Sequence, residues 1–179
     1  TTDVTVSYGE SSATTTLKVI ESVTSYEVGD IILTNGTKLS VSDVATYTID
    51  ENNKPIGVVT MIYDIYEVPT PKVIGLQKSA SRLIWAPEDT TGYNTDFTEI
   101  KVHTYWSSYS GSTIDGDLDG RDNWEYICSI DPEGTQDAAT NYPIFNFANT
   151  YGTTAGLTGT DYETGWYVPS VAEVYGVYK

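Results

Sequence analysis

The segment PIGVVTMIY, residues 55–63, constrains the fold more than any other stretch of the chain. A strand with one solvent-exposed face alternates apolar and polar residues, whereas this segment is apolar almost throughout. We therefore expect a central strand that is buried on both faces and has a neighbour on each side. Further strand candidates lie at 31–33, 37–41, 72–77, 84–85 and 98–102.

Turn signals and composition agree with a β-rich chain. Asn35-Gly36 is a tight-turn dipeptide, while Asn52-Asn53 and the two prolines within 69–71 indicate loops. The chain contains 15 Tyr and 4 Trp, which are residue types that strands favour. Its hydrophobic fraction of 39% is large enough for a core.

Residues 1–25 are predicted to form a β-hairpin. Residues 3–8 and 14–20 alternate with the period of a strand, and the segment GESS at 9–12 supplies the turn. A lone hairpin is marginally stable at best, so these strands need a sheet to join.

Two later segments have a convincing helical pattern. Residues 141–151 carry Pro143 near their start, apolar residues at helical spacing and Gly152 as a stop. The second helix starts from a capping box formed by Ser170 and Glu173. We expect its inward face to be Val171, Val174, Tyr175 and Tyr178, with Trp166 buried just before it. No stop signal precedes Lys179, so we expect the domain to be interrupted there.

The single cysteine, Cys128, excludes an internal disulfide. The segment WEYICSI at 124–130 alternates as a strand would. Because free cysteine is among the most buried residue types, we expect Cys128 to be a buried thiol with a packing role.

The segment GWYVPSVAE at 165–173 resembles an element of C-type-lectin-like domains, in the branch shared by formylglycine-generating enzymes and many bacterial surface proteins. Residues 4–20 resemble the last two strands of a bacterial immunoglobulin-like repeat, although an ordinary hairpin of the main domain explains them equally well. Further segments similar to recurring pieces of the lectin-like surface domains lie at 26–33, 54–58, 84–87, 117–124, 130–135, 141–143 and 149–151.

The resemblance implies an α+β, β-rich fold, in which a twisted antiparallel sheet with two flanking helices follows an immunoglobulin-like hairpin. It divides the chain into the hairpin, 1–25, and a C-type-lectin-like domain, 26–179, that lacks its last strands at the C-terminus. It also implies secretion. The formylglycine-generating branch needs reactive cysteines in the late region, whereas Cys128 lies elsewhere. Since His103 is the only histidine and has no nucleophile nearby in sequence, we expect no enzymatic activity.

A candidate metal site lies in the segment DGDLDGRDNW, residues 115–124. Three alternating carboxylates followed by a glycine match the first half of a calcium loop. The expected ligands are Asp115, Asp117, Asp119 and Asn123, and the expected cofactor is Ca²⁺. The position of the bidentate Glu of an EF-hand is held by Tyr126, so the site would be a loop site and not an EF-hand. A solvated acidic turn is the open alternative.

A candidate ligand platform lies at Tyr105, Trp106 and Tyr109, among serines. Aromatic faces can stack on the apolar surface of a sugar while hydroxyls form hydrogen bonds. The alternative is that these rings fill the core from a loop.

The net charge of −16 excludes nucleic acid as a partner, because a polyanion gains nothing from a phosphate backbone. No apolar run approaches the ~18 residues of a membrane span. We therefore expect a non-catalytic interaction module of a secreted or cell-surface protein, bacterial or phage, of an adhesin-like kind. Its ligand would be a protein or a carbohydrate. The alternative is a structural subunit of a pilus or surface filament, completed by strands from a neighbouring copy.

Overall fold

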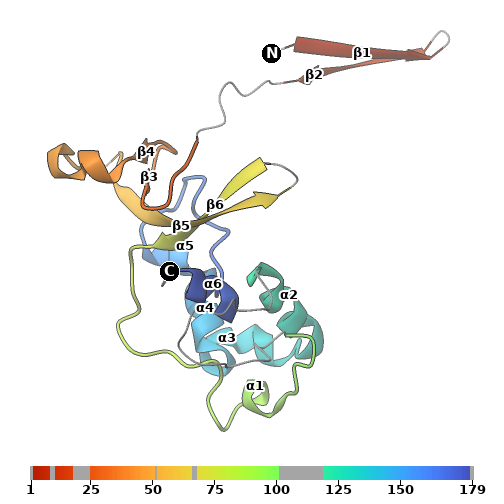
Figure 1. The fold of residues 1–179 in the computed structure, drawn as a ribbon. Helices are drawn as coiled ribbons and strands as arrows, with labels where there is room; N and C mark the ends of the chain where they lie inside the picture. The colour runs from red at the N-terminus through yellow and green to blue at the C-terminus, as the bar shows by residue number, and fades with distance from the viewer. Residues whose placement is uncertain are drawn as a thin grey trace.

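The computed structural model describes residues 2–8, 11–17, 25–50, 52–65, 68–100 and 119–177. It has an α+β fold with two antiparallel sheets. The first is a hairpin of β1 (Thr2–Tyr8) and β2 (Ser11–Leu17), with Thr2 opposite Leu17. This confirms the predicted hairpin, which lies apart from the second sheet (Figure 1).

The second sheet has four strands in the order β4-β3-β5-β6. They are β3 (Ile31–Leu33), β4 (Lys38–Leu39), β5 (Pro55–Ile65) and β6 (Val68–Gly75). The predicted central strand is confirmed, because β5 pairs with β3 on one side and with β6 on the other. None of residues 55–63 is exposed.

The interpretation of residues 69–71 as a loop is wrong, since Pro69 and Pro71 lie inside β6. A proline cannot donate to a strand ladder and is therefore confined to the edge of a sheet. Because β6 is the edge strand among the described residues, it tolerates both prolines. The strand expected at 37–41 shrinks to β4, and a 3-10 helix, η1 (Val41–Thr46), follows it.

The strands expected at 84–85 and 98–102 are also not observed where the structure describes the chain. Residues 84–85 and 98–100 form turns and loops, and residues 101–102 lie outside the described residues. The remaining elements are helical: α1 (Thr91–Asn94), α2 (Arg121–Ile130), η2 (Gly134–Asp137), α3 (Ala138–Asn141), α4 (Pro143–Asn149), α5 (Tyr151–Thr154) and α6 (Val171–Gly176).

The strand expected at 124–130 is wrong, because these residues belong to α2. Helical spacing puts Trp124 and Ile127 on one face, which packs against Tyr142 and Phe145. Burial of that face outweighs the local alternation that had suggested a strand. Cys128, on the same helix, is half-buried and not fully buried as expected.

The helix expected at 141–151 is divided among α3, α4 and α5. Pro143 stands at the start of α4, as predicted. Gly152 does not stop a helix, since it lies within α5. It is buried, and a Cβ at this position would collide with the backbone of Glu163.

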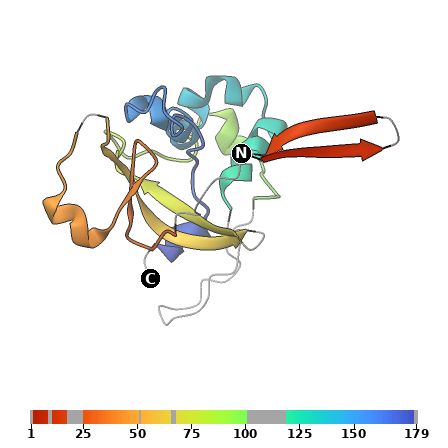
Figure 2. The same cartoon turned by 90° about the horizontal axis from the view of Figure 1, so that it is seen from above.

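Two clusters form the core. The first joins the sheet to α5 and contains Ile32, Ile56, Val59, Tyr151 and Leu157. The second lies among the helices and contains Ile127, Tyr142 and Phe145. Figures 1 and 2 show α2, α3 and α4 gathered beside the four-stranded sheet.

Candidate binding groove

The C-terminal helix α6 begins with the predicted capping box. The backbone N–H of Glu173 donates to the Ser170 hydroxyl at 3.2 Å, and the backbone N–H of Ser170 donates to the Glu173 carboxylate at 2.9 Å. This pattern satisfies two N–H groups that the first turn of a helix leaves unpaired. The capping box is therefore confirmed in both directions.

Glu173 does more than cap the helix, because its side chain is 2% exposed. Besides the bond from Ser170, the carboxylate accepts a second hydrogen bond from the backbone N–H of Gly120 at 3.0 Å and a third from the Tyr167 hydroxyl at 2.7 Å. Lys72 of β6 pairs with it at 3.2 Å. A buried carboxylate is tolerated only when its oxygens are paired in this way.

Lys72 extends the network towards α2. Its ammonium group lies 2.9 Å from the Tyr167 hydroxyl and 3.3 Å from Asp119, in addition to its contact with Glu173. Lys72 thus donates two hydrogen bonds, to Tyr167 and Asp119, and forms an ion pair with Glu173. Two carboxylates and the lysine thus meet around one phenol.

Asp119 is held on its other side by Arg121, whose guanidinium donates to both carboxylate oxygens. These hydrogen bonds hold the pKa of Asp119 at about 2, well below its usual range. Burial, and then the hydrogen bond to Glu173, raise the pKa of the Tyr167 hydroxyl, which therefore stays protonated at neutral pH. The network pairs two cations with two anions and is close to neutral.

The network explains Gly120, which the calcium interpretation treated as the turn of a metal loop. A Cβ on Gly120 would meet the backbone of Val168 and Ser170. Glycine is therefore required here for close packing against the segment that leads into α6. The start of α2 is fixed to the start of α6 through Glu173.

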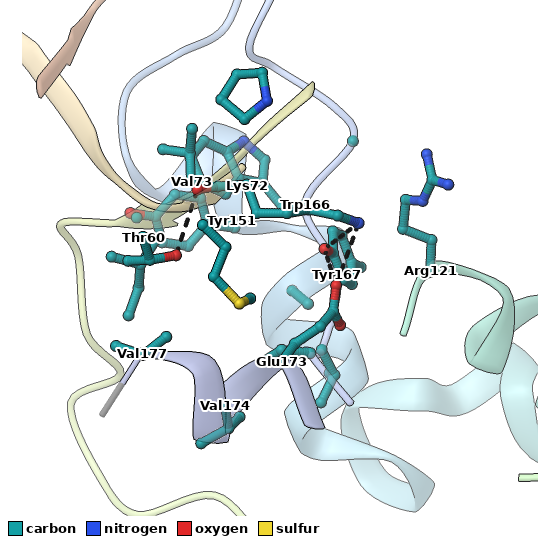
Figure 3. Close-up of a pocket in the computed structure, with 18 of the residues that line it drawn as sticks. Thr60, Lys72, Val73, Arg121, Tyr151, Trp166, Tyr167, Glu173, Val174 and Val177 are labelled. Carbon is teal, nitrogen blue, oxygen red and sulfur yellow. Dashed lines mark hydrogen bonds and ion pairs between the residues drawn. The ribbon is translucent and has the colours of Figure 1, made fainter. Parts of the chain in front are cut away.

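A groove of about 580 Å³ opens beside this network (Figure 3). One wall is β6, of which residues 70–75 all line the groove, and the opposite wall includes Val174 of α6 and Val177 just after it. Successive strand residues point to opposite faces, so six consecutive lining residues place the groove along the edge of β6. The volume lies in the range of pockets that hold small molecules or the side chains of a peptide.

The walls of the groove expose apolar side chains. Val174 is 40% and Val177 is 42% exposed, and Ile74 of β6 is 50% exposed. This corrects the expected inward face of α6, since Val171 is also 50% exposed. The buried face of the helix consists of Ala172 and Glu173 instead. The side chains of Tyr175 and Tyr178 lie outside the described residues.

Trp166 was expected to be buried before α6. It is half-buried, donates its indole N–H to the Tyr162 carbonyl at 2.7 Å and packs 4.3 Å from the Tyr151 ring, centroid to centroid. The ring therefore lines the groove and also packs against the first core cluster.

The predicted site residues fall mostly outside the described part of the chain. These are Tyr105, Trp106 and Tyr109 of the aromatic platform, and Asp115 and Asp117 of the metal site. Asp119 is described and binds Lys72 and Arg121, while Asn123 lies on α2. Among the described residues, no group of three or more acidic, histidine or cysteine side chains could hold a metal ion. The calcium site stays a prediction.

Sequence reasoning identified Ser170 and Glu173 but not their partners. Lys72 lies in an apolar strand, and its side chain is only 12% exposed, so a buried anion had to be near it. Nothing in the sequence indicates that this anion is Glu173, which lies about a hundred residues later. The groove was missed because α6 exposes the face that its apolar pattern had predicted to be inward.

Comparison with family models, with curated proteins and with solved structures finds no match to this chain. Within the described ranges, no helix is long and apolar enough to cross a membrane.

Proposed function

We propose that this protein is a non-catalytic interaction module whose binding surface is the groove between β6 and α6. The observation that carries the proposal is the exposure of Ile74, Val174 and Val177 around a groove of about 580 Å³. Exposed apolar side chains that gather around a cavity are typical of a binding surface.

The charged network beside the groove supports a non-catalytic role. Catalytic acids and bases need a proton or a lone pair that is available to a substrate. The side chains of Glu173, Lys72 and Tyr167 instead bind one another and the backbone. In this proposal the network is a rigid support that holds α6 at a fixed distance from β6.

The resemblance of residues 165–173 to C-type-lectin-like surface domains supports a secreted or cell-surface location. In this proposal the described sheet and helices belong to a lectin-like domain, and the hairpin belongs to an immunoglobulin-like repeat. The ligand is a protein or a carbohydrate, and the net charge of −16 disfavours a polyanion. Calcium bound at 115–123 would add to the stability of the module without taking part in the groove.

A filament subunit is the second candidate function. One observation favours it: β6 is an edge strand among the described residues, and edge strands can pair with a strand of another chain. The same net charge of −16 on every copy opposes this assembly.

The test compares Val174→Asp with Val171→Asp on immobilised glycan and peptide arrays. Both valines are exposed on α6, but only Val174 lines the groove. We expect Val174→Asp to reduce binding of the retained ligands by about tenfold or more and Val171→Asp to leave it unchanged. Val177→Asp serves as an independent groove variant, and circular dichroism checks the fold of each protein. Equal binding by all variants, or no retained ligand at all, would contradict the proposal.

A further inference from the structure

The backbone of β6 determines which part of its edge can pair with another strand. The Leu76 N–H, just after β6, donates to the Ile56 carbonyl of β5 at 3.3 Å. Backbone groups alternate in direction along a strand, so those of Gly75, Val73, Pro71 and Pro69 point away from β5. The two prolines fit this assignment, because their nitrogens need no partner in the ladder.

The outer edge of β6 is therefore divided into two halves. In the first half, Pro69 and Pro71 remove the N–H donors, which is a common protection of an edge against pairing. In the second half, Val73 and Gly75 retain their outward backbone N–H donors. Among the hydrogen bonds from loops and turns of the described residues, none has either N–H as its donor. Val73 and Gly75 of this unprotected half line the groove, as do Val174 and Val177.

From this arrangement we infer that the occupant of the groove is an extended polypeptide strand of another protein. The strand pairs with the backbone of Val73 and Gly75, and its alternate apolar side chains enter between β6 and α6. Addition of a strand to an exposed edge, with pockets for alternate side chains, is an established mode of peptide recognition. The inference rests on the proposed function of the groove and specifies its ligand.

The net charge specifies the partner strand further. At −16, the protein repels a second copy of itself and attracts basic segments. The occupant is therefore a strand in which apolar residues alternate with lysine, arginine or threonine. A second copy of this chain is the competing occupant, and the experiment below distinguishes it.

The probe is an array of short capped peptides in which valine alternates with lysine and threonine. The strongest binder is compared with the same peptide carrying N-methyl groups on alternate residues, in both registers. N-methylation removes the N–H donors from one edge of the peptide and leaves its side chains in place. We expect one register of N-methylation to weaken binding by about tenfold or more and the other register to have little effect.

The matched protein variants are Val73→Pro and Val73→Ala. Both remove the valine side chain, but only proline also removes the outward N–H. Since Pro69 and Pro71 already occupy equivalent positions, Val73→Pro is compatible with the β5 ladder. We expect Val73→Pro to bind the peptide about tenfold or more weakly than Val73→Ala, with equal far-ultraviolet circular dichroism.

The outcomes separate this inference from the proposed function. If Val174→Asp loses binding while Val73→Pro and Val73→Ala bind equally, the groove is a binding surface but its ligand is not a strand paired with β6. Retention of glycans alone, or no peptide bound by the native protein, would overturn the strand as well. Self-association that Val73→Pro abolishes would also contradict it, because the occupant would then be a second copy.

Discussion

At the scale of single residues, Glu173 has the largest effect on the rest of the molecule. Its carboxylate connects β6, the start of α2 and the start of α6 through Lys72, Gly120 and Ser170. A capping glutamate is ordinarily exposed at the end of a helix, where its contribution is modest. Here the same side chain is buried, so its removal would take from Lys72 its buried partner and leave only the partly exposed Asp119 at 3.3 Å to balance a lysine with little access to water.

We expect Glu173→Gln to lower the free energy of unfolding by about 3 kcal/mol, because it breaks a buried ion pair and leaves Lys72 only the partly exposed Asp119 as a counter-charge. Urea denaturation measures this change. The control is the double variant Glu173→Gln with Lys72→Met, which removes both charges and should recover part of the loss. A Glu173→Gln protein as stable as the native one would show that the network is not structural.

Asp119 makes the stability of the folded protein depend on pH in the acid range. Its pKa of about 2 in the folded protein lies below the value of about 3.9 in an unfolded chain. A depressed carboxyl pKa stabilises the fold above the unfolded value, and this stability is lost as pH falls through the folded value. Stability should therefore decline between about pH 4 and about pH 2. Because Asp119 is 38% exposed, solvent screening keeps the contribution small.

The check is the difference in unfolding free energy between native protein and Asp119→Asn, measured from neutral pH to acid. The difference should be largest at neutral pH and disappear at the acid end. A constant difference across this range would mean that Asp119 acts through its shape and not through its charge.

At the scale of elements, sequence reasoning succeeded where one pattern dominates. The apolar run at 55–63 predicted a central strand, and β5 occupies that place. It failed where a segment fits both the alternation of a strand and the spacing of a helix, so that tertiary contacts decide which one forms. Residues 124–130 alternate as a strand would, yet Trp124 and Ile127 also share a helical face, and contact with Tyr142 and Phe145 selects the helix.

The same limit explains the errors at β6 and α6. Prolines 69 and 71 indicate a loop unless the strand is known to lie at an edge, and edge position is a property of the whole sheet. For α6, the apolar pattern selected Val171 and Val174 as the buried face, but the hydrogen bonds of Glu173 turn that residue inward. The capping box was predictable because its two residues are three positions apart. The network was not, because Lys72, Asp119 and Tyr167 are distant in sequence.

Gly152 provides a test at this scale. It lies in α5 against the backbone of Glu163, where no Cβ fits without movement. We expect Gly152→Ala to destabilise the protein by about 1–3 kcal/mol through overpacking. Gly156→Ala is the comparison, since open space surrounds it and its cost comes from a φ of +71° alone. If Gly152→Ala is the milder of the two in thermal unfolding, α5 does not pack as described.

At the scale of the whole molecule, the net charge of −16 makes cations the natural stabilising ligands. For the predicted calcium site we expect a gain of about 2.7 kcal/mol when free calcium exceeds its dissociation constant about a hundredfold. The variant is Asp115→Asn with Asp117→Asn, which leaves the contacts of Asp119 with Lys72 and Arg121 intact. Thermal melting of both proteins with calcium and with chelator measures the gain. Melting temperatures that do not depend on calcium would contradict the predicted calcium site.

The same charge decides between a binding module and a filament subunit. Repulsion between copies extends over about 10 Å at 0.1 M salt and about 3 Å at 1 M salt, so high salt permits contacts that low salt prevents. An interaction module with a foreign partner should elute as a single monomeric species at both salt concentrations. A filament subunit should assemble as salt screens the repulsion, and electron microscopy would then show polymers. We expect the monomer in both conditions, because on the outward side of β6, where Pro69 and Pro71 lack an N–H, the remaining donors are those of Val73 and Gly75. Such a short free edge suits a peptide held by side-chain contacts in a groove better than a strand that must support a filament.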